Sequence, residues 1–593
     1  MQKNSLIRFL LLASIALLTV VPLVAETPDL VAVTNEVTSE LASIVARYSS
    51  DSRALSRRYD ASPSPAADVR WRSFYDGWKT AMAEIDFDDL SVEGRIDYIL
   101  LNKEIEYGLQ SLEIEGKQVA EAAPLIPFAS QIVALQESRR NFEDVDPGGA
   151  AKALDGITNV IKDTHASVER GLEKDDGGKE ARLTATKSVA KRAAGAVDDL
   201  SRTLEDWHGH YDGFDPLFSW WTREPYEKAH TAIEAYSKLL REKLVGEEAG
   251  EDAPIVGDPA GRDSLMADLE VAMIPYTPEQ LIAIGEREFE WCDREMKKAA
   301  AELGYDDWHD ALEYVKGLHV EPGRQVELTR DLANEAIAFL RDRDLLTIPP
   351  LAVEIWRMTM LSPERQKVAP FFLGGEEVQV AFPTDTMSHD EKLMAMRGNN
   401  IHFSRAVVHH ELIPGHHLQG FMIERYQSHR RLFYTPFWME GWALYWEMRL
   451  WDLGFPQSPE DRIGMLFWRM HRCARIVFSL KFHLGEMAPQ EAIDYLVERV
   501  GHERDNATAE VRRSFEGGYP PLYQLAYMMG ALQLRALHEE MVVHGEMTEK
   551  EFHDAILQGG IMPIEMVRAR LRGDLLERDY KTSWRYAGEV KGR

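Results

Sequence analysis

The sequence predicts a mainly α-helical protein with two lobes, a deep cleft between them and one small β element. Apolar residues recur at three- and four-residue spacing over most of the chain, which is typical of helices that pack against a core. Capping signals mark where several of these helices begin. The chain has 593 residues, which is more than one small core organises, so we expect two lobes that form one unit.

The first 25 residues have the features of an export signal. Lys3 and Arg8 precede an apolar run from Phe9 to Val24, and Ala25 offers a small residue for cleavage. No later stretch reaches the roughly 18 uninterrupted apolar residues that a membrane-spanning helix needs. We therefore expect residues 1–25 to be a signal peptide, and the mature protein to be periplasmic or extracellular without a stable membrane span.

Two helical segments follow the signal, joined by a loop. We expect residues 26–250 to form an N-terminal helical lobe, because apolar residues keep helical spacing up to about Leu244. The segment from Gly246 to Arg262 gathers Gly, Pro, Asp and Glu, which is typical of a loop. Residues 263–593 are expected to form a second lobe.

Two four-residue signals in the second lobe predict helix starts. In the first, Thr277 is the expected cap, Pro278 occupies the first helical position, and Gln280 lies three residues after the cap and returns its hydrogen bond. The segment Ser458–Asp461 repeats this pattern. We predict that a helix begins at each site.

A short β element is predicted between Leu373 and Thr384. Gly374 and Gly375 lead into the run Val378–Phe382, and Pro383 ends it. A strand edge beside a metal site can pair with an extended peptide. An ordinary surface hairpin is the alternative interpretation.

Histidines cluster just downstream of this element. Six of the nineteen histidines fall between His402 and His429, and two doublets, His409-His410 and His416-His417, flank Glu411. A hydrolytic zinc site needs imidazole or carboxylate ligands and leaves one position open for water. In the His-Glu-x-x-His pattern of a helix, two imidazoles share one face and the glutamate lies beside that water. The cluster therefore indicates a zinc site.

The spacing in this chain differs from that pattern. Pro414 takes the position four residues after His410, and Gly415 follows it, so the helix must bulge or break there. If the two residues form an excursion, His416 returns to the place of the second ligand. In an unbroken helix, His417 would share the face of His410 but lie about 10.5 Å away along the axis. We favour His416, with His417 as a neighbour that binds substrate or orients a ligand.

A third ligand is expected from the aromatic segment that begins at Trp438. Glu440 lies 29 residues after Glu411, which is enough chain for the first helix to end and a second to return beside it. A carboxylate in this apolar stretch would be costly to bury without a partner, and a metal provides one. Glu447 lies two turns further on the same face, where it could accept a hydrogen bond from a ligand imidazole.

These motifs resemble a known bacterial family. The stretch His410–Gln419, with Glu440–Tyr445, is similar to the family called domain of unknown function 885. The resemblance extends from about Tyr276 to Pro563 and is weaker over the first 250 residues, and the segment between Met360 and Arg397 departs from the family pattern. It implies a metallopeptidase-like fold of the gluzincin type, similar to thermostable carboxypeptidases and more distantly to peptidyl-dipeptidases.

The resemblance also points to a late helix and the arginines before it. Gluzincins use a tyrosine or histidine from such a helix to stabilise the oxyanion, and Tyr527 fits that place, whereas Tyr523 and Tyr527 taken alone are one turn apart and typical of a core. Arg512 or Arg513 is placed where it could hold a substrate carboxylate, although pairing with an acidic side chain is the ordinary role of arginine.

Composition excludes other classes of protein. The formal net charge is −30, and such an acidic surface repels the phosphate backbone, so nucleic acid is not an expected partner. Two cysteines, Cys292 and Cys473, are too few for a disulfide framework. We expect both to be buried thiols.

We therefore expect a zinc-dependent peptidase that acts on short peptides, in the manner of a carboxypeptidase or a dipeptidase. One zinc ion per chain would be held by His410, His416 and Glu440. Glu411 would act as the general base, and Tyr527 would stabilise the oxyanion.

Three alternatives use different features. An exported binding or scaffolding protein with a degenerate site would explain the Pro-Gly interruption. A hydrolase of non-peptide amides would use the same residues. A dimetal oxidase needs Glu-x-x-His pairs on facing helices, and Glu227 with His230 forms one such pair, for which an exposed helix face is the simpler interpretation.

Overall fold

The computed structural model describes residues 39–173, 181–247, 254–366 and 372–589, and the predicted signal peptide lies outside these ranges. The fold is mainly α-helical, as predicted. The elements before the loop near residue 250 are α2 (Ala42–Arg58), α3 (Pro65–Ala83), α4 (Val92–Ala122), η1 (Ala123–Leu125), α5 (Ala129–Arg140), α6 (Pro147–Leu172), α7 (Lys187–Tyr211), α8 (Pro216–Leu239) and η2 (Leu240–Val245).

The elements after that loop form the larger part of the molecule. Those before the histidine cluster are α9 (Arg262–Val271), α10 (Pro278–Glu302), α11 (Trp308–Lys316), α12 (Gln325–Asp342), α13 (Pro350–Ile355), β1 (Arg357–Met360), α14 (Pro363–Gln366), β2 (Phe372–Leu373), β3 (Glu377–Val380) and α15 (His389–Gly398). Those from the cluster onward are α16 (Ile401–Glu411), α17 (His416–Ile423), η3 (Ser428–Phe433), α18 (Pro436–Asp452), α19 (Pro459–His483), α20 (Pro489–Val500), α21 (Arg504–Glu516), α22 (Tyr523–His538), η4 (Glu539–Val543), α23 (Glu549–Gln558) and α24 (Ile564–Arg572).

Local signals account for where key helices begin. At α10, Thr277 and Gln280 form the expected capping box around Pro278. At α19, the Ser458 side chain accepts from the backbone N–H of Asp461. Both predicted helix starts are thus confirmed. The two cysteines are free and buried, as expected.

The β element is a three-stranded sheet with the order β1-β3-β2. Strand β3 is central: it pairs in parallel with β1, with Arg357 opposite Glu377, and antiparallel with β2, with Leu373 opposite Gln379. Val378 and Val380 turn into the core. The predicted element is therefore present, and it is joined by an additional strand at 357–360 that was not predicted from the sequence.

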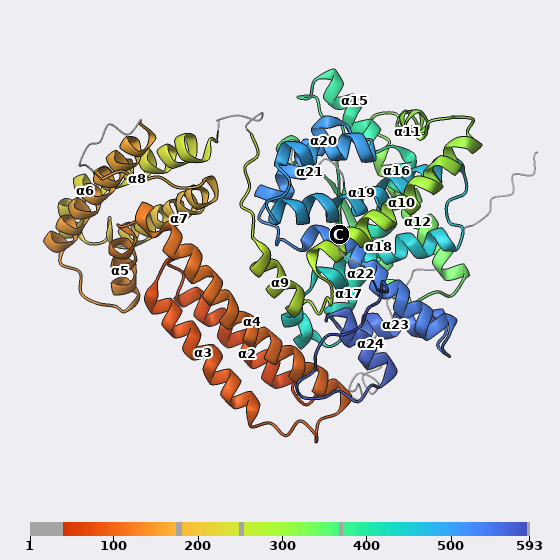
Figure 1. Cartoon of the computed structure of the whole chain (residues 1–593), viewed down its shortest axis with the longest axis horizontal. Coiled ribbons are helices and arrows are strands. Elements are labelled where there is room, and N and C mark those ends of the chain that lie inside the picture. Colours follow the sequence, from red (N-terminus) through yellow and green to blue (C-terminus); the bar gives the residue numbers. More distant parts are fainter. Residues whose placement is uncertain (1–38, 174–180, 248–253, 367–371, 590–593) are drawn as a thin grey trace, which may run out of the picture.

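Two hydrophobic cores divide the structure, and α4 belongs to both. The larger core joins α2, α3 and the first half of α4 to the elements from α9 onward. The smaller core extends from the end of α4 to η2. Figure 1 shows α2, α3 and α4 as an elongated bundle that carries α5–α8 at one end and lies along the body formed by the later helices. The division between cores thus falls within α4, while the loop near residue 250 links the two parts of the chain.

A buried ion cluster ties α4 to the later helices. Arg430 in η3 is fully buried and pairs with Asp97 at 2.7 Å and Glu93 at 2.6 Å, both on α4. Its Nη1 also donates to the carbonyl of Gly559 at 2.6 Å, and His429 lies 2.6 Å from Asp97. The charge of the arginine is therefore fully matched, as burial requires.

Helices α18 and α22 cross at two glycines. A Cβ built on Gly441 would lie 2.6 Å from the Cα of Gly530, and one on Gly530 would lie 2.0 Å from the carbonyl oxygen of Phe437. No larger residue fits at either position without moving a helix. This close crossing places the first turns of α22 beside Glu440 on α18.

Within the described residues, no single helix has the length and hydropathy needed to cross a membrane. One pair, Val92–Leu125 with Ala129–Arg140, meets both criteria only across a bend of 115°.

Candidate functional site

The helix that carries the histidine cluster breaks where proline and glycine interrupt it. Helix α16 ends at Glu411 and α17 begins at His416. The turn between them folds back closely, because a Cβ on Gly415 would lie 1.7 Å from the carbonyl oxygen of His410. Glycine is therefore required for the approach of α17 to the end of α16. The break brings His416 back toward His410.

Three side chains converge at this break. His410, His416 and Glu440 each offer a ligand atom, and these atoms all lie within 4.8 Å of one another. The Oε2 atom of Glu440 is 3.1 Å from Nε2 of His416 and 3.6 Å from Nε2 of His410. Ligands about 2.05 Å from a tetrahedral metal are roughly 3.3 Å apart, so these spacings suit a zinc ion. Among the described residues, this is the one group with metal-ligand geometry.

The other nitrogen of each imidazole is held by a neighbouring side chain. Nδ1 of His410 lies 2.6 Å from Oε1 of Glu447, and Nδ1 of His416 lies 3.1 Å from Oε1 of Gln419. Because the oxygen acceptor fixes the orientation of each ring through Nδ1, the Nε2 atom of each ring is directed toward Glu440. Metal-binding histidines are oriented in this way by their outer partners.

The second histidine of each doublet points elsewhere. Nε2 of His417 donates to the carbonyl oxygen of Ala352 on α13 at 2.6 Å, so this ring packs under the β element. Nδ1 of His409 donates to the carbonyl of Arg405 at 2.9 Å. Neither ring takes part in the convergent group.

The charges at the site are strongly coupled. Burial lowers the pKa of the His410 imidazole, but the contacts with Glu440 and Glu447 outweigh it and raise the pKa to about 9. Burial raises the pKa of Glu440, and the two imidazoles outweigh it and hold that pKa well below its usual range. For Glu411, burial dominates and the pKa is raised. A bound cation would displace the imidazole protons, because only neutral imidazole binds metal.

Glu411 is packed against the β element. A Cβ built on Gly374 would lie 2.0 Å from Oε2 of Glu411, and the Gly375 N–H donates to the Glu411 carbonyl at 3.5 Å. The first of the two glycines therefore lets the chain after β2 lie against this carboxylate. The sequence signal at Gly374-Gly375 marks a constraint of the site as well as a turn.

Two tyrosines of α22 face the convergent group. The hydroxyl of Tyr523 donates to Oε1 of Glu440, so it holds a candidate ligand in place. The Tyr527 ring lies 5.7 Å from the Tyr523 ring and stacks at 6.1 Å on the His410 ring. Burial and the charge of Glu440 raise the pKa of Tyr527 to about 12, so its hydroxyl stays protonated. Sequence reasoning named Tyr527 and gave Tyr523 no role, since the contact with Glu440 depends on the glycine crossing.

Arg512 and Arg513, behind the tyrosines, pair with acidic side chains, which is the ordinary role of arginine. Arg512 donates to Glu516 at 3.2 Å, and Nε of Arg513 lies 3.7 Å from Glu510. Arg472 and Arg475 of α19 lie closer to the site, with guanidinium carbons 4.3 Å and 4.8 Å from the centre of the Tyr527 ring. Sequence reasoning missed this pair, although arginines three residues apart in a long apolar helix are a usable signal.

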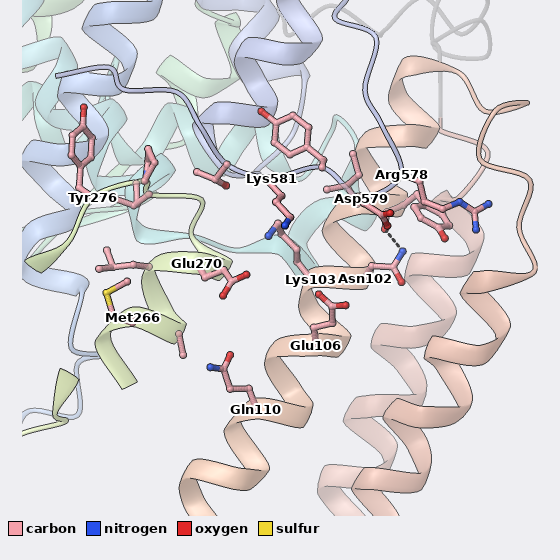
Figure 2. A pocket seen from close by; sticks show the side chains of 18 of the residues that line it. Asn102, Lys103, Glu106, Gln110, Met266, Glu270, Tyr276, Arg578, Asp579 and Lys581 are labelled. Carbon is pink, nitrogen blue, oxygen red and sulfur yellow. Dashed lines mark hydrogen bonds between the residues drawn. The ribbon is translucent and has the colours of Figure 1, made fainter. Parts of the chain in front are cut away.

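Two cavities lie on the same side of the molecule. The larger, about 850 Å³, lies between α4, α9 and the C-terminal segment, and its lining residues include Lys103 and Lys581 (Figure 2). The second, about 380 Å³, also reaches Lys103 and is lined by Tyr434, Pro521 and Tyr523. Tyr523, whose hydroxyl donates to Glu440, is part of the wall of this second cavity.

The chain is similar to a bacterial protein family and to two solved structures. A family model described as "Bacterial protein of unknown function (DUF885)" matches residues 48–571. A solved structure titled "The structure of a putative lipoprotein of unknown function from Shewanella oneidensis" is similar, with a TM-score of 0.65, 16% identity and coverage of 90% of this chain and 100% of that chain. A second, "The crystal structure of the putative lipoprotein from Colwellia psychrerythraea", has a TM-score of 0.52, 16% identity and coverage of 90% and 98%. No curated protein matches the chain.

Proposed function

The chain belongs to the DUF885 family of bacterial proteins, and we propose that it is a zinc-dependent peptidase that hydrolyses peptide bonds in short peptides. The convergence of His410, His416 and Glu440, with Glu411 beside them, carries this proposal. Two imidazoles and one carboxylate are a donor set that zinc uses in hydrolytic sites.

The residues fit a single zinc ion. His410, His416 and Glu440 would hold it, and Glu447 and Gln419 would orient the two rings. When bound, the ion would polarise the substrate carbonyl and lower the pKa of a water molecule.

Glu411 is suited to the role of general base. Its carboxylate is buried, and its pKa is raised by that burial, which brings it closer to the range in which a carboxylate both takes and returns a proton. Glu411 would accept the proton of the attacking water and deliver it to the amine nitrogen that leaves.

Tyr523 and Tyr527 would have separate roles. Tyr523 positions Glu440 through its hydroxyl. Tyr527 keeps its proton at neutral pH, so it can donate a hydrogen bond to the substrate carbonyl oxygen as negative charge develops there.

The second cavity supports a peptide as the substrate. Its volume of about 380 Å³ suits a few residues, and its wall combines aromatic rings and prolines with Lys103, Glu104 and Asp268. Such a wall accepts apolar side chains while polar groups orient the backbone.

Export is part of the proposal. The predicted signal at residues 1–25 supports it, and both similar solved structures are titled putative lipoproteins. We propose that the protein acts outside the cytoplasm, in the periplasm or beyond.

Incubation of the purified protein with a mixed peptide library, read by mass spectrometry, tests this function. We expect cleavage by the zinc-loaded wild type and none by Glu411→Gln, with about one zinc ion per chain in both. The exposed Glu424→Gln is the matched control and should cleave like the wild type. Equal cleavage by Glu411→Gln and wild type, or no zinc in either, would refute the proposal.

A further inference from the structure

Three arginines share one carboxylate behind the tyrosines. Nε of Arg475 donates to Oε1 of Glu510 at 2.7 Å, and Nε of Arg513 lies 3.7 Å from Oε2 of the same group. Arg472, one turn before Arg475, forms no ion pair with any described residue, within the 4.0 Å that defines one. Glu510 is thus the one carboxylate among the described residues within 4.0 Å of the arginine cluster, Arg472, Arg475 and Arg513, while Glu411 and Glu447 act on Arg472 over a longer distance.

Arg472 is the member with free hydrogen-bonding capacity. Its side chain is 6% exposed, and its Nε is buried without a partner among the described residues. Its guanidinium lies over the rings of Tyr527 at 4.3 Å and Trp468 at 5.6 Å. Nη1 of Arg475 and Nε of Arg513 are also buried without hydrogen-bond partners in the described part of the chain.

Other buried arginines have carboxylates in direct contact, although Nε of Arg469 is also without a hydrogen-bond partner among the described residues. Arg430 has two carboxylates and a backbone carbonyl. Arg469, one turn before Arg472 on α19, pairs with Glu288 at 3.3 Å and lies over Trp291. A buried guanidinium without a carboxylate in direct contact is costly, so Arg472 is suited to bind an anion from outside the chain.

Such an anion would lie near the reacting bond. Tyr527 contacts both groups: its ring stacks on that of His410 at 6.1 Å, and the Arg472 guanidinium carbon lies 4.3 Å from the ring centre. We propose that Arg472, supported by Arg475 and Arg513, binds the α-carboxylate at the C-terminus of the substrate, which makes the protein a carboxypeptidase. This inference rests on the proposed peptidase function and adds the end from which the peptide is cut.

The spacing suits cleavage near the C-terminus. The two contacts of the Tyr527 ring place the Arg472 guanidinium at most about 10.4 Å from the His410 ring. Each residue of an extended chain spans about 3.4 Å, so this separation corresponds to at most about three residues. The aromatic cavity beside Tyr523 would then receive the residues before the cut bond. Arginine binds a carboxylate through two parallel hydrogen bonds, and Arg472 has its terminal nitrogens available for them.

A pair of peptides that differ only at the C-terminus tests the inference. We expect the wild type to hydrolyse a blocked tetrapeptide with a free carboxylate at least about 100-fold more efficiently than its C-terminal amide, since loss of a buried charge pair has effects of this size. In Arg472→Gln, kcat/KM for the free acid should fall by a similar factor, while kcat/KM for the amide changes little. Arg472→Lys should recover part of the preference.

The matched control is Arg469→Gln on the same helix. It removes a paired arginine, so it should lower the thermal stability but keep the preference for the free acid. Arg472→Gln removes a charge that has no ion-pair partner among the described residues, so this variant should melt at the same temperature as the wild type or higher. A lower melting temperature for Arg472→Gln, with an unchanged preference, would show a structural role and overturn the inference.

Binding separates this inference from the proposed reaction. Calorimetric titration of Glu411→Gln with the same two tetrapeptides should show tighter binding of the acid, and the double variant with Arg472→Gln should lose that difference. If no peptide is hydrolysed but the difference in binding remains, the reaction fails and the carboxylate site stands. Equal binding of acid and amide would overturn the site. Strong binding of an amide that ends in aspartate, but not in asparagine, would assign the cluster to a side-chain carboxylate and also overturn it.

Discussion

Nδ1 of His410 lies 2.6 Å from Oε1 of Glu447, two turns along α18 from Glu440. One helix thus provides both a candidate metal ligand and the group that orients another ligand. Because Glu447 holds the proton of His410 on Nδ1, the Nε2 atom is committed to the convergent group.

Replacement of Glu447 by glutamine should weaken zinc binding by about 10- to 100-fold, the usual effect of losing such a partner. Competition with a chromophoric chelator measures this affinity. Glu424→Gln, at an exposed position of the same type, should leave it unchanged. Equal affinities of the two variants would remove Glu447 from the site.

The two neighbouring histidines should respond differently to alanine. His416→Ala removes a convergent nitrogen, so metal analysis should find far less than one zinc ion per chain. His417→Ala loses its hydrogen bond to the Ala352 carbonyl, which lowers stability by about 1 kcal/mol, yet it should retain the metal. The reverse result would assign His417 as the ligand.

The two tyrosines should separate binding of metal from catalysis. Tyr527→Phe should lower kcat by about 10²- to 10³-fold with the zinc content unchanged, which is the effect of removing one oxyanion donor. Tyr523→Phe removes the hydrogen bond to Glu440 and should weaken zinc binding. A loss of zinc in Tyr527→Phe would contradict this division.

The glycine crossing should tolerate no added methyl group. Gly441→Ala places a Cβ 2.6 Å from the Gly530 backbone, and such overpacking costs about 1–3 kcal/mol or more. Gly420→Ala on α17, where the added Cβ would meet nothing within 4 Å, should be neutral or stabilise the helix. Urea unfolding compares the two, and equal stabilities would contradict the close crossing.

Acid should destabilise the fold through His553. Its Nδ1 donates to the Leu345 carbonyl and its Nε2 accepts from the Tyr445 hydroxyl, both at 2.8 Å, and burial lowers its pKa to about 3. The unfolded pKa is about 6.5, so the stabilisation is complete above that pH and is lost as pH falls toward 3. Between pH 7.5 and pH 5 the loss from this group is about 2 kcal/mol.

His553→Asn removes the titrating ring and keeps a donor near Leu345. Its stability at pH 7.5 should be lower, but the further loss between pH 7.5 and pH 5 should be about 2 kcal/mol smaller than in the wild type. Denaturant unfolding at the two pH values measures both quantities. An unchanged dependence on pH would show that other groups account for the acid effect.

Several features of the structure could be predicted from neighbouring residues in the sequence. The caps at Thr277 and Ser458 act within one helical turn, so their helix starts could be predicted from neighbouring residues. The interruption at Pro414 and Gly415 is equally local, and it directed attention to His416. These features need no knowledge of the tertiary structure.

Relations between distant helices could not be predicted in this way. Tyr523 meets Glu440 only because Gly441 and Gly530 let α18 and α22 touch. Arg472 is notable because no carboxylate of the described residues lies within 4.0 Å of its guanidinium nitrogens. These contacts depend on how the helices pack against one another, so the spacing of residues within a single helix does not predict them.

The ion cluster at Arg430 limits where the chain can be cut to give a stable fragment. Its two acidic partners, Asp97 and Glu93, lie far ahead of the loop near residue 250. A fragment cut at that loop would keep the buried guanidinium and lose both carboxylates, along with the part of the larger core that α2 to α4 provide. A fragment that keeps the convergent group together with a complete larger core therefore has to begin before α2, whereas the helical unit between the end of α4 and η2 has a core of its own.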